Sequence, residues 1–213
     1  MRRFLFVGVH ALTASLVLAG EPGEAPRERT AEPVIGGCDG CELAFKSMPG
    51  QPETHSRIVP EGEEGQPLLI DGVVRTAEGK PVSGVIIYAH QTNSRGIYPG
   101  LGRHGNLRGW ARSDSEGRYS FRTIRPGAYP RRAIPQHVHL QVIEPGRAVY
   151  YIDDIVFEDD PLLTPAQRAG LENRGGNGIV NPRREGDGVW RVTRDIVLGA
   201  NVPGYERLSP RAR

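Results

Sequence analysis

Residues 137–157 read HVHLQVIEPGRAVYYIDDIVF, and this stretch decides the fold class. Two apolar runs, 137–143 and 149–157, flank Glu144-Pro145-Gly146, a turn sequence that can reverse the backbone. Successive side chains of a β-strand point to opposite faces, so alternation of apolar and polar residues marks a half-buried strand. The stretch therefore predicts two consecutive strands joined by a tight turn.

Short apolar runs separated by turn residues recur from Pro67 onward. Further runs with strand character occupy 68–75, 84–90, 118–124 and 189–198. One brief helix is expected, with Thr164 as its N-cap and Pro165 at its first position. Short strands with almost no helix predict an all-β fold, an antiparallel β-sandwich of the prealbumin or immunoglobulin type with long loops.

Composition limits both the fold and the partners. The 213 residues include 28 Gly and 18 Pro, which interrupt helices, and 38% hydrophobic residues, which suffice for one domain of ordinary size. Lys and Arg number 27 against 25 Asp and Glu, a formal net charge of +2. That balance excludes generalised nucleic-acid binding, which requires a large basic excess.

The N-terminus has the features of a secretory signal. Arg2 and Arg3 precede an apolar run from Phe4 to Ala19, so residues 1–20 are interpreted as a signal peptide for export to the periplasm or the extracellular space. The run is shorter than the roughly 20 residues that span a bilayer, and no stable membrane insertion is expected after its removal. A short membrane anchor is the alternative, and the route of export stays open between the general and the twin-arginine pathways.

The segment that follows lacks the pattern of a domain. Residues 21–66 carry Pro, Gly and Glu without sustained periodicity, which predicts an extended N-terminal arm, with order beginning near Pro67. Residues 67–200 are assigned to the sandwich and 201–213 to a C-terminal tail. In an oxidising compartment Cys38 and Cys41 favour a local disulfide that shapes the arm, with a redox pair or part of a metal site as the alternatives.

Alternation along 137–143 places two histidines on one face of a strand. One side carries Val138, Leu140 and Val142, and the other carries His137, His139 and Gln141. Two imidazoles that project from one strand toward the same volume are a common way of placing two nitrogen ligands on one metal ion. The alternative is a pair of partly exposed histidines on a sheet face. His90 and His104 could be ligands in a rival scheme, but each is alone in its segment, and they are interpreted either as surface residues or as residues that pack against the metal ligands.

Other segments accompany the histidine pair in a fixed order. They are Arg95-Gly96-Ile97-Tyr98, Asp114 to Thr123, Pro126-Gly127-Ala128-Tyr129-Pro130 and Pro135-Gln136-His137-Val138-His139. The ordered set of Gly-x-Tyr, Pro-Gly-x-Tyr-Pro and His-x-His, within residues 67 to about 161, resembles the intradiol ring-cleavage dioxygenases, the family of the catechol and protocatechuate dioxygenases.

The resemblance implies an enzyme with a non-haem ferric ion bound by Tyr98, Tyr129, His137 and His139. Fe(III) is a hard, highly charged cation, so it favours anionic oxygen and can displace the phenol proton of tyrosine. The resemblance further implies that O2 cleaves an aromatic 1,2-diol between its hydroxyl-bearing carbons to give a muconate-type diacid. Tyr129 is expected to leave the metal and accept a proton when the diol binds, and no organic cofactor is required.

Some positions depart from the family pattern. Ile134 stands where many members have an arginine that polarises the substrate, so that role is assigned to Arg132, with Arg131 as the neighbouring alternative. Asp153 and Asp154 stand where the family often has a glutamine that contacts the site. The identity of the diol stays open between a free ring and a fragment of a larger phenolic, and the oligomeric state also stays open.

Two other functions compete with a dioxygenase. Residues 71–85 and 114–129 also resemble the prealbumin-like modules found as non-catalytic domains, so a secreted β-sandwich binding module is one alternative. A zinc hydrolase that uses the histidine pair with Asp153 or Asp154 is the other. Neither requires Tyr98 and Tyr129. Residues 95–132 contain nine Arg and two acidic residues, a local excess that would attract phenolates or aromatic acids unless it is simply a solvent-facing surface.

Overall fold

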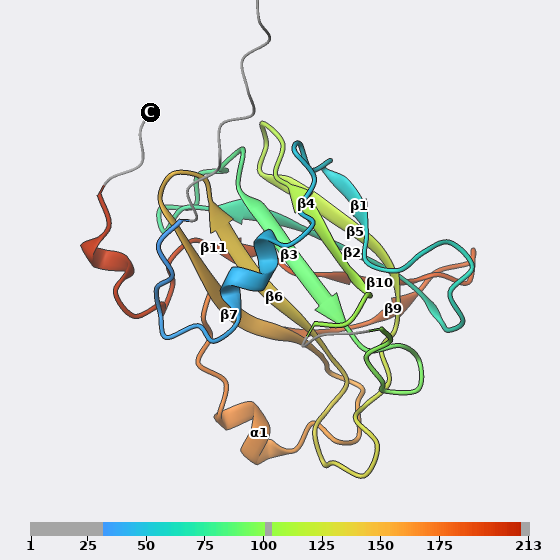
Figure 1. Cartoon of the computed structure of the whole chain (residues 1–213). Coiled ribbons are helices and arrows are strands. Elements are labelled where there is room, and N and C mark those ends of the chain that lie inside the picture. Colours follow the sequence, from blue (N-terminus) through green and yellow to red (C-terminus); the bar gives the residue numbers. More distant parts are fainter. Residues whose placement is uncertain (1–31, 101–103, 210–213) are drawn as a thin grey trace, which may run out of the picture. The chain divides into compact units, whose positions relative to one another are not determined.

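Two β-sheets face each other across a shared core (Figure 1). The structure is a computed structural model, and it describes residues 32–100 and 104–209. The first sheet has the order β1 (His55–Arg57), β5 (Arg118–Ile124), β2 (Pro67–Arg75), β10 (Trp190–Thr193) and β9 (Arg183–Arg184), with β11 (Ile196–Val197) also paired to β2. The second has the order β4 (Arg108–Arg112), β3 (Ile86–Gln91), β6 (His137–Glu144), β7 (Ala148–Phe157) and β8 (Ile179–Val180).

The core lies between the sheets because the long strands turn their apolar sides inward. Ile70 and Phe121 of the first sheet share this core with Leu140 and Ile155 of the second, and none of the four is more than 1% exposed. Burying a side chain of this size stabilises a fold by about 1.5 to 3 kcal/mol relative to exposure. The predicted β-sandwich with little helix is confirmed, whereas the signal peptide predicted at 1–20 lies outside the described residues.

The sheets are mixed rather than purely antiparallel. The long strands β2, β3, β5, β6 and β7 pair with one another in the predicted antiparallel manner. Strands β1, β8, β10 and β11, of two to four residues each, pair in parallel with a neighbour. The segment 189–198, expected as one strand, is divided into β10 and β11 because the side chain of Arg194 turns into the interior between them.

Four strands, β1, β4, β8 and β9, lie outside the expected runs, and β1 and β4 carry few large apolar residues. Inward positions of β4 are taken by Gly109 and Ala111, and a Cβ on Gly109 would collide with the backbone oxygen of Arg57 in β1. The close approach of two backbones therefore excludes a larger side chain there. Because β1 belongs to the predicted arm and pairs with β5, the ordered region begins before Pro67, contrary to the expected boundary.

Residues 38–48 of the arm pack on the outer face of the second sheet. Its short 3-10 helix η1 (Cys41–Phe45) buries Cys41 and Ala44 in a cluster with Tyr88 of β3. The indole nitrogen of Trp110 donates a hydrogen bond of 2.6 Å to the carbonyl of Ala44. Cys38 and Cys41 form a disulfide, which is the first of the alternatives expected for them.

The expected helix is present as α1 (Pro165–Ala169). Thr164 caps it, since its hydroxyl accepts from the backbone N–H of Gln167 while the side chain of Gln167 accepts from the backbone N–H of Thr164. The C-terminal segment includes a 3-10 turn, η2 (Tyr205–Arg207). Within residues 32–100 and 104–209, no helix has the length and apolar character needed to cross a bilayer.

Candidate metal centre

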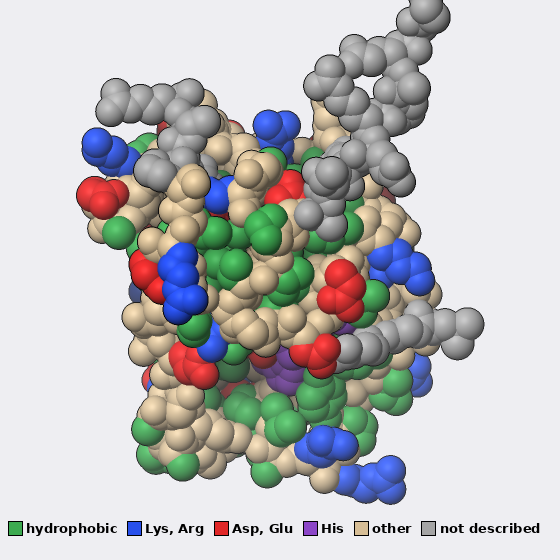
Figure 2. Space-filling model, turned by 60° about the vertical axis from the view of Figure 1, so that its left-hand side comes forward, with side chains coloured by type: hydrophobic (Ala, Val, Ile, Leu, Met, Phe, Trp, Pro, Cys, Tyr) green, Lys and Arg blue, Asp and Glu red, His purple; other side chains and the backbone are tan. Residues whose placement is uncertain are grey.

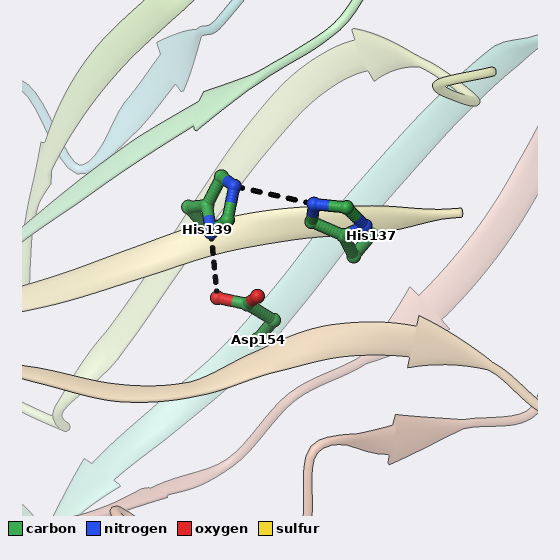
Figure 3. A group of neighbouring side chains, drawn as sticks. All are labelled: His137, His139 and Asp154. Atoms are coloured by element: carbon green, nitrogen blue, oxygen red, sulfur yellow. Dashed lines mark hydrogen bonds and ion pairs between the residues drawn. The ribbon is translucent and has the colours of Figure 1, made fainter. Parts of the chain in front are cut away.

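The two histidines of β6 lie on its outer face, away from the core, as the alternation predicted (Figure 3). Their Nε2 atoms are 3.2 Å apart. The Nδ1 of His137 donates to the carbonyl oxygen of Pro135 at 2.6 Å, and the Nδ1 of His139 donates to Oδ1 of Asp154 at 3.0 Å. Because both Nδ1 atoms are donors, both Nε2 atoms carry lone pairs that are available to a metal ion.

Two phenols complete the cluster. The Tyr129 oxygen lies 3.1 Å from Nε2 of His137 and 3.3 Å from Nε2 of His139, and the Tyr98 oxygen lies 2.8 Å from that of Tyr129. Ligand atoms bound to one ion at 2.0–2.2 Å, with angles of 90–120° between them, are about 2.8 to 3.8 Å apart. The four side chains predicted as ligands are therefore brought together at the spacing of a single donor set.

Glycines allow two loops to bring the phenols together. The backbone N–H groups of Gly96 and Gly127 both donate to the carbonyl of Asn93, at 3.0 and 2.8 Å. A Cβ on Gly96 would overlap the carbonyl of Ala128, and Gly96 has φ 76, a conformation that favours glycine. Each tyrosine follows its glycine by two residues, so the backbone contact of the glycines sets the approach of the two phenols.

A β-bulge positions the acid beside His139. Ile152 and Ile155 of β7 are both fully buried in the core, although three positions would place them on opposite faces of a regular strand. The register of β6 and β7 shifts at this point, so Asp153 and Asp154 together oppose His139. Bulges re-aim side chains next to functional sites. The spacing of the two isoleucines is the sequence signal that could have indicated this bulge.

The two acids of the bulge have different partners. The carboxylate of Asp153 accepts the backbone N–H groups of Asn173 and Arg174, at 2.7 and 3.2 Å, so it holds a loop rather than a metal. Asp154 lies close enough to the histidine pair to belong to a possible metal group. Its oxygen contacts Nδ1 of His139, however, on the opposite edge of the ring from the Nε2 that faces the cluster (Figure 3). Asp154 therefore orients the imidazole of His139.

Burial favours the neutral form of three of the four candidate ligands in the absence of a cation. It raises the pKa of Tyr98 and of Tyr129, and it lowers the pKa of His137. Burial also acts to lower the pKa of His139, but the charge of Asp154 outweighs it, so that this pKa is raised. A bound cation favours the ionised phenol and the neutral imidazole. Metal binding and loss of the phenol protons are therefore coupled.

Two buried histidines pack behind the cluster. His90 of β3 pairs across the strands with His139 and stacks on it at 4.6 Å, while its other face stacks on His104 at 3.9 Å. The hydroxyl of Tyr88 lies 2.9 Å from Nδ1 of His104. The stack restricts rotation of the His139 ring. The expectation that His90 and His104 lie at the surface is wrong. The register of β3 against β6 buries the ring of His90, and the fold of the loop before β4 buries the ring of His104.

Beside the cluster opens a cavity of about 760 Å³ (Figure 2). In the view of Figure 2 a purple patch of histidine lies recessed between acidic (red) and hydrophobic (green) side chains. Ile134 lines this cavity, whereas Arg132 is exposed and is not among the described lining residues. The charge of Arg132 acts to lower the pKa of Tyr129 against the effect of burial. The expectation that Arg132 polarises the substrate stays a prediction.

Arg194 fixes the backbone behind the bulge. It is 1% exposed and donates to the carbonyl oxygens of Asp153, Arg174, Gly175, Gly176 and Asp195.

Arg194→Met is expected to lower the free energy of unfolding by about 3 kcal/mol or more, because several buried carbonyls lose their donor. Urea denaturation measures the loss. Arg191→Met, which removes only surface ion pairs with Glu185 and Asp187, is the control and should cost less than about 1 kcal/mol; equal losses would contradict this role of Arg194.

Asp154→Asn keeps the size of the side chain and removes its charge. The variant is expected to hold a metal ion about 10 to 100-fold more weakly, which is the usual effect of losing an outer partner of a histidine ligand. Competition with a chelator measures the affinity. Asp159→Asn is the matched control, because the carboxylate of Asp159 pairs with Arg125 and not with one of the four candidate ligands. Unchanged metal retention in Asp154→Asn would show that Asp154 does not support the His139 ligand.

This β-sandwich gathers two phenols and two imidazoles at the spacing of one donor set, an arrangement that could hold a metal ion. Comparison with known families agrees: a family model described as Dioxygenase matches residues 45–174. The chain belongs to the intradiol ring-cleavage dioxygenase family.

Individual relatives are similar over part of their length. Catechol 1,2-dioxygenase 1 of Acinetobacter lwoffii is 38% identical over 122 residues, a match that spans 47% of this chain and 39% of that relative. Chlorocatechol 1,2-dioxygenase of Pseudomonas putida is 28% identical over 204 residues, spanning 83% and 71%. Among solved structures, the dioxygenase domain of a dioxygenase carbohydrate-binding protein fusion from Streptomyces sp. SirexAA-E is 26% identical with a TM-score of 0.54, covering 73% of this chain and 96% of that one.

Proposed function

We propose that the protein is a non-haem iron dioxygenase that cleaves an aromatic 1,2-diol between its two hydroxyl-bearing carbons. The observation that carries the proposal is the convergence of two phenol oxygens and two imidazole Nε2 atoms at successive separations of 2.8 to 3.3 Å. Relatives named as catechol and chlorocatechol 1,2-dioxygenases support the same reaction. The product is a muconate-type diacid.

The donor set suits a ferric ion. Two ionised phenols, from Tyr98 and Tyr129, together with one hydroxide would balance three positive charges, and the neutral imidazoles of His137 and His139 add no further charge. A bound ferric ion supplies a Lewis acid that holds both oxygens of the diol and makes the ring reactive toward O2. The hydrogen bonds from Nδ1 to Pro135 and Asp154 hold the two imidazoles in the required tautomer.

Tyr129 is suited to act as the proton acceptor. Its oxygen lies within 3.3 Å of three other donor atoms, and its side chain lines the cavity into which a diol would enter. When the diol takes its place, the ionised Tyr129 oxygen can accept a diol proton, and the phenol is then neutral, the state that burial favours. In the overall reaction the carbon–carbon bond breaks and each carbon gains one atom of O2, so no further reductant is needed.

Metal content, colour and oxygen uptake test the proposal together. Purified protein supplied with iron should hold about one iron per chain and be burgundy red, because charge transfer from ionised tyrosine to Fe(III) absorbs visible light. An oxygen electrode should record consumption of one O2 per molecule of catechol or hydroxyquinol. Protein that stays colourless and binds no iron would overturn the proposal and favour the non-catalytic binding module, whereas a colourless zinc protein would favour the hydrolase.

We also propose that the protein is exported, with residues 1–20 as its signal peptide. The disulfide between Cys38 and Cys41 supports this location, because such bonds persist in oxidising compartments. Mass spectrometry of the protein from the periplasm or the medium should find an N-terminus near residue 20. Protein that remains in the cytoplasm and retains Arg2 and Arg3 would contradict export.

A further inference from the structure

The cavity beside the metal centre is larger than a single aromatic ring requires. Its volume of about 760 Å³ lies within the roughly 300 to 1,000 Å³ that pockets for drug-sized ligands have. Its wall begins at His137 and His139 and continues to a second group of residues, which we call the distal subsite: Gly37, Cys38, Asp39, Tyr151, Leu171 and Glu172. A one-ring diol at the metal centre would leave the distal subsite empty.

Contacts between distant segments hold the distal subsite in shape. Arg174 donates from Nη1 to the carbonyl of Gly36 at 2.7 Å, which ties the disulfide loop to the segment after α1. The guanidinium of Arg174 also lies 4.2 Å from the centre of the Tyr151 ring and pairs with Glu172. The Cys38–Cys41 disulfide closes the loop itself. The distal subsite is therefore a formed wall.

Gln141 lies between the metal centre and the distal subsite. It follows His139 by two positions along β6, about 7 Å, and faces Tyr151 across the strand pair. Its side chain lines the cavity and is 4% exposed, yet its Oε1 has no hydrogen-bond partner among the described residues. Buried polar atoms are nearly always paired, so this carbonyl marks a place for a donor group of a ligand.

The charge of the lining favours an uncharged ligand. The carboxylates on the cavity wall belong to Asp39, Asp153, Asp154 and Glu172, of which Glu172 pairs with Arg174 behind the wall, and the described part of the wall includes no Lys or Arg. The described arginines of residues 95–132, which were expected to attract aromatic acids, lie outside this wall. A carboxylate on the diol would meet like charges in a partly enclosed space, which disfavours its binding.

We propose that the preferred substrate is a catechol carrying an uncharged, hydroxyl-bearing aromatic substituent, which occupies the distal subsite and donates to Gln141. This inference rests on the proposed function, because the diol end of the molecule must lie at the metal centre. It predicts that the enzyme acts on two-ring phenolics in preference to catechol itself and to catechols with a carboxylate.

Three pairs of compounds test the preference. We expect kcat/KM for 4-phenylcatechol to exceed that for catechol at least about tenfold, and 4-(4-hydroxyphenyl)catechol to exceed 4-phenylcatechol further. Methyl 3,4-dihydroxybenzoate should exceed 3,4-dihydroxybenzoate by about tenfold, since the two differ mainly in charge. Equal or reversed preference in any of the three pairs would overturn the inference.

Variants connect the preference to particular residues. Leu171→Trp, which fills the distal subsite, should lower kcat/KM for 4-phenylcatechol at least about tenfold more than for catechol. Leu162→Trp, on the other side of α1 and outside the cavity lining, is the matched control and should leave that ratio unchanged. Gln141→Leu should abolish the advantage of the hydroxylated compound. A ratio that Leu171→Trp does not change would contradict the assignment of the distal subsite.

Calorimetric titration without O2 separates this inference from the proposed function. The same order of dissociation constants, with 4-phenylcatechol below catechol, is expected without turnover, and Leu171→Trp should reverse it. If no diol is oxidised but this order holds, the proposed function fails and the distal subsite stands. If catechol is oxidised and the two dissociation constants are equal, the proposed function stands and the distal subsite fails.

Discussion

His137→Ala and His139→Ala are each expected to abolish oxygen uptake with any diol and to release the metal. Each removes a neutral nitrogen donor whose Nε2 lies 3.2 Å from the other, so the ion keeps at most one imidazole. Removal of an outer partner alone weakens a metal site about 10 to 100-fold, so loss of a ligand should exceed about 100-fold in both affinity and kcat/KM. Metal analysis after dialysis and an oxygen electrode measure the two effects.

The control for the histidine variants is His55→Ala. His55 is an exposed residue of β1 that bonds to the Ser120 hydroxyl of the neighbouring strand β5, in the sheet that does not carry the histidine pair, so iron content and turnover should match the parent protein. Normal oxygen uptake by either His137→Ala or His139→Ala would remove that residue from the donor set. Loss of iron without loss of the folded state, judged by urea denaturation, distinguishes a ligand from a residue needed for stability.

The sandwich was predictable because its central strands carry their own signals. Alternation in 137–143 predicts β6, and the turn at Glu144-Pro145-Gly146 predicts its pairing with β7. β4 was not predictable in this way, because Gly109 and Ala111 fill its inward positions and the reason for small residues there is the crossing of β1. A requirement set by a neighbouring backbone leaves no periodic pattern in the sequence.

The grouping of the four candidate ligands was predictable through motifs, while the residues that support them were not. Tyr98 and Tyr129 each follow a glycine by two residues, a local pattern that is visible in the chain. The role of Asp154 depends on a register shift between β6 and β7, and the role of His90 depends on its position opposite His139. Both are properties of strand pairing, which residue identities alone do not specify. The proposed specificity likewise depends on the disulfide loop, whose location against the cavity is a tertiary feature.

Tyr98→Phe and Tyr129→Phe are expected to have large but different effects. Each removes a phenol oxygen from a donor set in which these oxygens are 2.8 Å apart, and with it one negative charge that would balance the proposed ferric ion. Both variants should therefore retain less iron and show an altered visible spectrum. Tyr129→Phe also removes the proposed acceptor of the diol proton, so its kcat per bound iron should fall about 100-fold or more.

Comparison of kcat per bound iron separates the two tyrosines. Tyr98→Phe should lose activity mainly in proportion to the iron it loses. Tyr129→Phe should remain slow even when it is fully loaded with iron, because it lacks the proposed acceptor of the diol proton. Tyr205→Phe is the control. Tyr205 lies in the C-terminal segment, where its hydroxyl accepts a hydrogen bond from Arg147, so this variant should keep the colour and rate of the parent protein. Full colour in both Tyr98→Phe and Tyr129→Phe would exclude the phenols as ligands, and equal rates per iron would exclude Tyr129 as the proton acceptor.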